Sequence, residues 1–146
     1  MGLRIVRLAS AALLLYAATV FAQESPKEDL YNFLSGKYLL IGQRPDSKTT
    51  YAGSVLLKNS RDSLEVSRTM NGMLTRGTGR ITEATADKVQ VLEVRFTDGK
   101  LGYVATYMIH SDLDNYGRLT GYLYLQDGTT KSPGLEALFI DHRALD

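Results

Sequence analysis

The sequence predicts an all-β domain whose eight short strands close into an antiparallel, up-and-down barrel. Three observations lead to this prediction. Turn signals recur about every ten residues between runs that are rich in β-branched and aromatic side chains. Apolar and polar residues alternate along the best-defined runs, as in sheets with one buried face. No amphipathic helix of useful length lies between the strands, which excludes parallel βαβ units.

The run from Asp87 to His110 is the clearest strand pair. Its central Asp98-Gly99 is a favoured pair for a type I′ turn, because both residues tolerate a positive φ. A turn closed by Thr97 and Lys100 then sets the register of the two strands. This register predicts one apolar face, made of Leu92, Val94, Phe96, Leu101, Tyr103 and Ala105.

A short helix is predicted before the first strand. Ser25-Pro26-Lys27-Glu28 fits a capping box with proline at the first helical position, and the apolar stripe of the helix ends at Leu34. A helix of about two turns is not stable alone, so we expect it to dock on the sheet as a plug or lid.

Six further runs complete the predicted sheet, and each is bounded by turn residues. They are Lys37–Gln43, Thr50–Lys58, Ser63–Thr69, Leu74–Thr82, Gly117–Leu125 and Leu135–His142. The turns between them contain Pro45-Asp46 and Asn71-Gly72, and Gln126–Gly134 is the most turn-like run. Glycines within strands favour a strongly coiled sheet that bends into a barrel, and these are Gly53, Gly77, Gly79 and Gly121.

The amino-terminal segment has the pattern of a secretory signal peptide. Arg4 and Arg7 precede an uncharged apolar stretch, and Val20-Phe21-Ala22 places small or moderately small residues before a cleavage site expected after Ala22. The alternative is a membrane anchor, but Leu8–Ala22 is shorter than the roughly 20 residues that a bilayer requires. We therefore expect a signal peptide at residues 1–22 and a single periplasmic or secreted barrel domain at residues 23–146.

The composition excludes several classes of function. There is no cysteine, so disulfides, thiolate metal sites and cysteine nucleophiles are absent. Removing the signal takes two of the 17 basic residues and none of the 16 acidic ones, so the net charge falls from +1 to about −1. A near-neutral chain with interspersed charges does not predict binding to nucleic acid or to an anionic membrane, and no membrane span is expected after signal cleavage.

The sequence predicts no enzyme, no cofactor and no metal centre. It contains no G-x-S-x-G motif and no phosphate-binding loop. Its only two histidines are His110 and His142, whereas zinc usually needs three or four nitrogen or sulfur ligands. Asp112–Gly117 resembles a calcium loop without the glutamate that closes such a loop, so a solvated acidic turn is the simpler interpretation.

The run Phe33–Tyr38 resembles the opening of lipocalins, in which a short helix leads into a first strand with a G-x-W motif. Here Tyr38 stands where the family has tryptophan, and the resemblance implies a partner arginine near the end of the barrel, at Arg143. The chain is also similar to small secreted bacterial lipocalin-like barrels, some of them labelled as fibronectin-binding. The matching pieces are Pro45-Asp46, Tyr51-Ala52-Gly53, Gly77-Thr78-Gly79, Gly117–Gly121 and Gly134-Leu135-Glu136.

The candidate ligand-binding residues are tyrosines on predicted strands and one carboxylate. The chain has nine tyrosines, four phenylalanines and no tryptophan. Tyrosines directed into a barrel would line a site for an amphipathic or aromatic molecule, whereas the alternative is that they fill the interior or pair outside. A buried carboxylate requires an arginine or tyrosine hydroxyls as partners. The candidates are Tyr51, Tyr103, Tyr107, Tyr122 and Glu136.

The sequence thus supports two functions that do not involve catalysis. The first is a secreted or periplasmic lipocalin-like protein that binds a small amphipathic or aromatic molecule. An eight-stranded barrel is just wide enough to hold one such ligand or to be filled by its own side chains. The second is therefore an interaction or inhibitor module with a filled barrel, whose partner is an envelope or extracellular protein.

Overall fold

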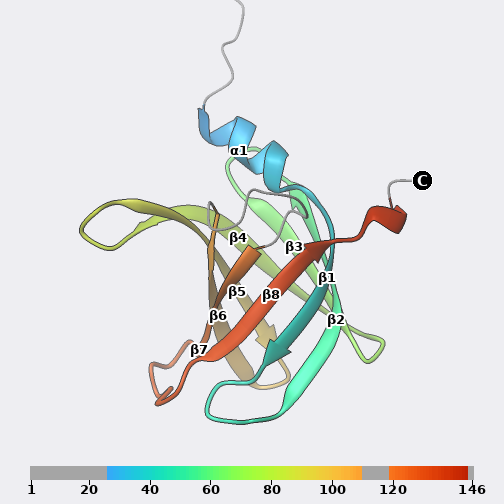
Figure 1. Ribbon diagram of the computed structural model, residues 1–146, viewed down its shortest axis with the longest axis vertical. Coiled ribbons are helices and arrows are strands. Elements are labelled where there is room, and N and C mark those ends of the chain that lie inside the picture. Colours follow the sequence, from blue (N-terminus) through green and yellow to red (C-terminus); the bar gives the residue numbers. More distant parts are fainter. Residues whose placement is uncertain (1–25, 110–118, 145–146) are drawn as a thin grey trace, which may run out of the picture.

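The computed structural model describes residues 26–109 and 119–144, which form a closed antiparallel barrel with one helix before the first strand (Figure 1). Each strand pairs with the next one in the chain, and the last pairs with the first, so the strand order is up-and-down. The predicted fold class, the eight strands and the short helix are confirmed within the described residues. The elements are helix α1 (Pro26–Leu34) and strands β1 (Gly36–Gln43), β2 (Thr50–Asn59), β3 (Leu64–Met70), β4 (Met73–Ala84), β5 (Val89–Asp98), β6 (Leu101–Met108), β7 (Leu119–Leu125) and β8 (Gly134–Ile140), followed by the 3₁₀ turn η1 (His142–Ala144).

Some of the predicted features lie outside the described residues. These are the signal peptide with its cleavage site after Ala22, the capping residue Ser25, His110, the acidic turn at residues 112–117, and the start of the predicted strand at residues 117–118. Among the helices of the described part of the chain, none has the length and apolar character needed to cross a membrane.

The register of the β5–β6 hairpin differs from the prediction by two residues. Asp98 pairs with Leu101 and Phe96 pairs with Tyr103, so the turn residues are Gly99 and Lys100 rather than Asp98 and Gly99. Gly99 has a φ of 62°, at the first turn position, where a type II′ turn places its glycine. The predicted turn is therefore wrong. The predicted face is correct, because a shift of two residues leaves every side chain on the same face. Leu101, next to the turn, is nevertheless 49 % exposed and does not join the buried part of this face.

The Asn71-Gly72 turn between β3 and β4 is confirmed. Met70 pairs with Met73, and the two residues between them have φ values of 51° and 76°. Two positive φ angles are the signature of a type I′ turn, which asparagine and glycine accommodate at little steric cost.

Helix α1 lies across one end of the barrel (Figure 1). Tyr31 and Leu34 on its inner face are buried in the core. The pairing of β3 with β4 stops at Leu64 and Gly79, and the next inward residue of β4, Ile81, donates its backbone N–H to the hydroxyl of Tyr31 at 3.0 Å. The helix therefore supplies both apolar cover and a hydrogen-bond acceptor to a strand that extends past its neighbour.

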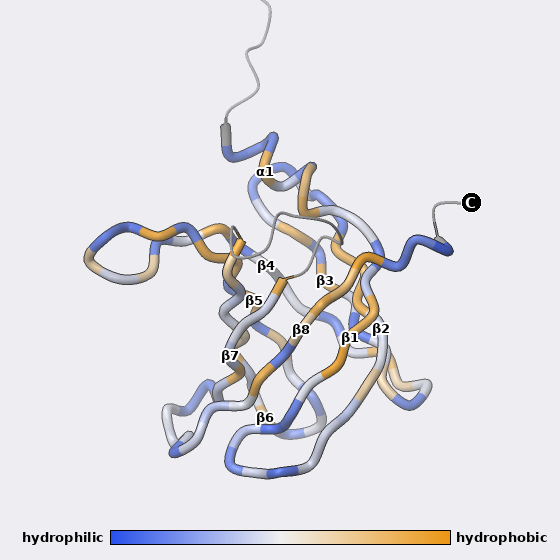
Figure 2. Tube along the Cα trace, viewed as in Figure 1, coloured by the Kyte–Doolittle hydropathy of each residue, from blue (hydrophilic) through white to orange (hydrophobic). Residues whose placement is uncertain are grey.

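The loops at the opposite end of the barrel are hydrophilic, whereas many residues within β1 and β8 are hydrophobic (Figure 2). The Asp46 carboxylate accepts hydrogen bonds from the backbone N–H groups of Lys131 and Ser132, at 3.0 and 2.6 Å for one oxygen. The Asp46 N–H in turn donates to the Ser132 carbonyl at 2.9 Å. These bonds tie the β1–β2 loop to the β7–β8 loop, so this end of the barrel is braced by polar contacts.

Tyr38 and Arg143 do not form the pair that the lipocalin resemblance implies. The Tyr38 side chain is buried, and its hydroxyl donates to the Leu34 carbonyl at 2.9 Å. Arg143 is 80 % exposed along its side chain, and its Nε donates to Asp141 Oδ1 at 3.1 Å. Tyr38 therefore connects β1 to the end of α1 rather than to the end of the barrel.

We predict that the Tyr38 hydroxyl contributes a pH-dependent part of the stability. Burial raises the pKa of Tyr38 to about 12, above the usual value of 10.0 for tyrosine. Above pH 10 the unfolded tyrosine loses its proton while the folded one retains it, so the free energy of unfolding falls as the pH rises toward 12. Tyr38→Phe should cost about 1 kcal/mol at pH 7 through the lost hydrogen bond.

Urea unfolding of both proteins from pH 7 to 11.5 checks this prediction. The difference in unfolding free energy between wild type and Tyr38→Phe should shrink above pH 10, because phenylalanine does not titrate. A difference that stays constant across this range would contradict the assigned cause.

Candidate functional site

A row of inward-facing residues crosses five adjacent strands. Cross-strand pairing connects Tyr107 on β6 to Gly121 on β7, Glu136 on β8, Gly42 on β1 and Tyr51 on β2. Each tyrosine is two strands away from Glu136, which is about 10 Å between backbones at the usual strand spacing. Both tyrosine side chains reach across a glycine, and both hydroxyls donate to the Glu136 carboxylate.

The two glycines of this row are required by close contacts. A Cβ atom at Gly42 would lie 2.6 Å from the Tyr51 ring, and one at Gly121 would lie 2.0 Å from the carbonyl oxygen of Thr106. Gly42 thus leaves space for the tyrosine that crosses it. Gly121 allows the β6 backbone to come close, and a side chain there would have to displace that backbone.

Arg68 reaches Glu136 from β3. Its Nη2 lies 2.5 Å from Glu136 Oε1 and its Nη1 lies 3.2 Å from Oε2, which is a bidentate ion pair. Nη1 also donates to the Tyr107 hydroxyl at 3.3 Å. The guanidinium carbon lies 4.0 Å from the centre of the Phe96 ring, and Phe96 stacks on Tyr103 at 5.2 Å. The charged pair is therefore enclosed by hydrogen-bond donors and aromatic rings.

Burial fixes the protonation of this cluster. Burial, and secondly the negative charge of Glu136, raise the pKa of Tyr107 and of Tyr51, so both hydroxyls keep their protons and act as donors. Burial alone would lower the pKa of Arg68, but the adjacent Tyr107 and Glu136 outweigh it and raise that pKa. Arg68 is therefore charged at every pH at which the protein is folded.

The cluster has almost no capacity to bind anything further. Oε1 of Glu136 accepts from Arg68 and Tyr51, and Oε2 accepts from Arg68 and Tyr107, which uses about all the acceptor sites of a carboxylate. The side chains of Arg68 and Glu136 are 1 % and 0 % exposed. Only Nε of Arg68 has no partner within the cluster. A general base needs an accessible oxygen, and neither oxygen of Glu136 is accessible in this arrangement.

A groove of about 1090 Å³ lies on the outer surface of the same strands. The base of the groove is a row of outward-facing residues, each of which comes directly before or after a residue of the inner row in the sequence. Cross-strand pairing connects this row in the order Ala52, Ile41, Ala137, Thr120 and Met108. The neighbouring row supplies the other side of the groove and contains Thr50, Gln43, Leu135, Tyr122 and Thr106.

The groove is apolar and open to solvent. Ile41, Tyr122 and Leu135 are each between 52 and 53 % exposed, and Met108 is 43 % exposed. Small residues between these side chains, such as Ala137, create the hollow. Exposed apolar side chains that share one concave surface are typical of a binding site, whereas single ones are common on any protein.

The structure brings some of the sequence-predicted site residues together and separates others. Tyr51, Tyr107 and Glu136 form the inner cluster, and Glu136 meets both an arginine and tyrosine hydroxyls, as expected for a buried carboxylate. Tyr103 lies beside that cluster, stacked on Phe96. Tyr122 faces outward in the groove, with its ring 6.4 Å from that of Tyr124.

Sequence reasoning missed Arg68, which pairs with Glu136 at the centre of the barrel. A signal was present in β3, because Leu64, Val66 and Arg68 alternate and therefore share one face of the strand. An arginine close to the end of a strand is usually exposed, which obscures this signal. The alternation rule places it inside, where a buried Glu136 would require it.

Only the strand topology of this barrel can be compared with known protein folds. No protein-family model matches the sequence, and no curated protein matches it. The closed eight-stranded up-and-down barrel is consistent with a lipocalin-like fold. Among the described residues, no group of three or more histidine, aspartate or glutamate side chains could hold a metal ion.

We predict that Arg68 and Glu136 are strongly coupled in stability. Arg68→Met leaves a buried carboxylate without its cation, and Glu136→Gln leaves a buried guanidinium without its anion. Each substitution should cost about 3–5 kcal/mol. The double variant Arg68→Met/Glu136→Gln should cost clearly less than the sum of the two, because it leaves neither charge unpaired.

Urea unfolding at pH 7 measures this double-mutant cycle. The exposed pair Arg95 and Glu93 is a matched control, because its Nε–Oε1 distance is 2.8 Å and Arg95 is 53 % exposed. Arg95→Met should cost less than about 1 kcal/mol. An Arg68→Met variant that loses no more stability than Arg95→Met would refute the central role of the buried pair.

Proposed function

We propose that this protein is an exported, non-enzymatic binding protein that holds a small, uncharged amphipathic or aromatic molecule in the outer groove. The groove itself is the observation that carries the proposal. Its volume of about 1090 Å³ is close to the range of about 300–1000 Å³ that is usual for ligand sites. Export is supported by the charged and apolar pattern of residues 1–22.

The side chains of the groove favour an uncharged ligand. Glu136 is the one charged residue that lines it, and its carboxylate faces the barrel interior, fully buried and saturated. The other polar groups directed into the groove are the amide of Gln43, the hydroxyls of threonines and the hydroxyl of Tyr122. A ligand with an apolar or aromatic body and a few hydrogen-bonding groups matches this set, whereas a charged ligand would lack a partner.

The hydrogen bonds among the inward-facing polar residues favour a site on the outside of the barrel. Three of the residues that the sequence suggested as ligand contacts, Tyr51, Tyr107 and Glu136, are instead joined by hydrogen bonds in the cluster around Arg68. Removing them from these contacts for a ligand would leave a buried charge incompletely paired, which costs several kcal/mol. The outer groove requires no such rearrangement.

Binding of a fluorescent neutral probe, N-phenyl-1-naphthylamine, tests the proposal. We expect saturable binding and a higher melting temperature, because a ligand of the folded state stabilises it by mass action. The double variant Ile41→Thr/Leu135→Thr removes two apolar contacts and should weaken binding about tenfold. Threonine retains a high strand propensity, so the barrel should remain folded.

The double variant Leu39→Thr/Leu56→Thr is the matched control. Both leucines face outward on β1 and β2 and are 39 and 47 % exposed, but neither lines the groove. Its affinity for the probe should equal that of the wild type. Absence of saturable binding, or an equal loss in the control, would exclude the groove as the site.

The second candidate is a protein-interaction or inhibitor module of the cell envelope. The filled interior favours it, as do Leu39 and Tyr124, which continue the exposed apolar surface beside the groove. Sedimentation velocity over a concentration series tests a second copy of this chain as the partner. Self-association that is lost in Ile41→Thr/Leu135→Thr, together with no probe binding, would favour this function over the first.

A further inference from the structure

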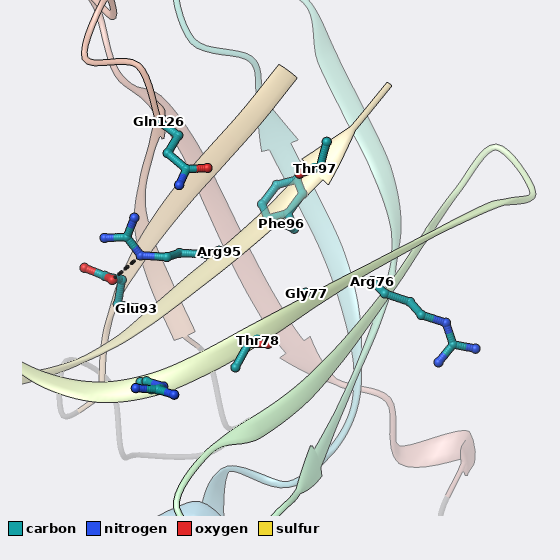
Figure 3. A pocket seen from close by; sticks show the side chains of 9 residues that line it. Arg76, Gly77, Thr78, Glu93, Arg95, Phe96, Thr97 and Gln126 are labelled. Carbon is teal, nitrogen blue, oxygen red and sulfur yellow. Dashed lines mark hydrogen bonds and ion pairs between the residues drawn. The ribbon is translucent and has the colours of Figure 1, made fainter. Parts of the chain in front are cut away.

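We propose that a second groove, on the outer surface of β4 and β5, binds a ligand that carries two or more anionic groups, such as neighbouring phosphates or carboxylates. The groove (Figure 3) has a volume of about 560 Å³, and it shares no lining residue with the apolar groove. It is lined by Arg76, Arg80, Arg95, Glu93, Thr78, Thr97 and Gln126, together with Gly77 and Phe96.

The groove has a net positive charge, and two of its arginine side chains have no acidic partner among the described residues. Three arginines face one carboxylate. Arg95 Nε donates to Glu93 Oε1 at 2.8 Å, which engages that carboxylate. Arg76 and Arg80 form no ion pair and no side-chain hydrogen bond within the described residues. Some other basic residues are paired, such as Lys37 with Asp141 and Arg44 with Asp98. The groove therefore has two guanidinium groups available for an external anion.

The spacing of the arginines requires more than one anionic group. Arg76 and Arg80 are four residues apart on the same face of β4, which places their Cα atoms about 13 Å apart in a strand. Thr78 pairs with Arg95 across the strands, so Arg80 and Arg95 are diagonal neighbours. Figure 3 shows Arg95 directed toward Glu93 and Arg76 directed away from both. One anionic group would bind at Arg80 and Arg95, and another at Arg76.

Uncharged hydrogen-bond donors also line the groove beside the two proposed anion positions. The Gln126 amide and the Thr78 and Thr97 hydroxyls line the groove. Guanidinium groups bind phosphate and carboxylate with paired N–H donors, and arginine remains charged at any physiological pH. An uncharged ligand would gain little from this surface, so the groove is distinct in chemistry from the apolar one.

Isothermal titration with inorganic tripolyphosphate at low salt tests the proposal. We expect one saturable site and markedly weaker binding of orthophosphate, which carries a single phosphate group. Arg76→Gln and Arg80→Gln should each weaken tripolyphosphate binding about fivefold, and the affinity should fall steeply with added salt. Citrate, titrated in parallel, distinguishes carboxylate from phosphate as the preferred group.

Lys48→Gln is the matched control, because it removes one exposed positive charge from the β1–β2 loop, which does not line the groove. It should leave the affinity unchanged. Arg76, Arg80 and Lys48 are all exposed, so their substitution should not unfold the protein. Melting temperatures equal to that of the wild type will show that the variants are folded. Three results would overturn the proposal: no saturable site for tripolyphosphate or citrate, orthophosphate binding as tight as tripolyphosphate, or an equal loss in Lys48→Gln.

Discussion

The ion pair between Arg68 and Glu136 is the contact on which the rest of this barrel depends. Two opposite charges that are almost fully buried are costly unless every donor and acceptor finds a partner. Here the carboxylate receives two hydrogen bonds from the guanidinium and one from each of two tyrosines. The pair connects β3 to β8, which do not pair with each other, so it also determines how far apart these two parts of the wall lie.

The same strip of backbone carries the inner cluster and the outer groove. Successive residues of a strand point to opposite faces, so Tyr107, Glu136 and Tyr51 inside are followed by Met108, Ala137 and Ala52 outside. The glycines that let tyrosines reach Glu136 also remove side chains from the interior of this wall. A wall held by buried hydrogen bonds is preorganised, which lowers the cost of ordering when a ligand binds to its outer surface.

Local pattern was sufficient to predict most of the fold. Alternation gives the strands and their buried faces, and the Asn71-Gly72 turn follows from two residues that accept positive φ. The register at Asp98-Gly99 could not be chosen with certainty from the turn alone, because Gly99 fits a type I′ turn and a type II′ turn alike. The face of each side chain was still predicted correctly, because it depends on whether the shift is an even or an odd number of residues and not on the exact pairing.

The candidate site was less accessible to sequence reasoning. Glu136 and its tyrosine neighbours could be suggested from strand faces, but Arg68 is 68 residues away from Glu136 in the chain, and only barrel closure brings them together. Whether a tyrosine lies inside or outside also depends on the absolute orientation of its strand. Tyr122 belongs to a strand whose Leu119 and Leu123 are buried, so its own side chain is outside.

A barrel of eight strands encloses so little space that it holds either a ligand or its own side chains. In this chain an aliphatic core lies inside the barrel together with the charged pair, three tyrosines and a phenylalanine. The buried carboxylate of the pair requires its surrounding donors to remain in place. The proposed binding therefore takes place on the outer surface, where side chains can vary without disturbing the interior. The two outer grooves illustrate this, since one is apolar and the other is rich in arginine, although both are built on the same closed sheet.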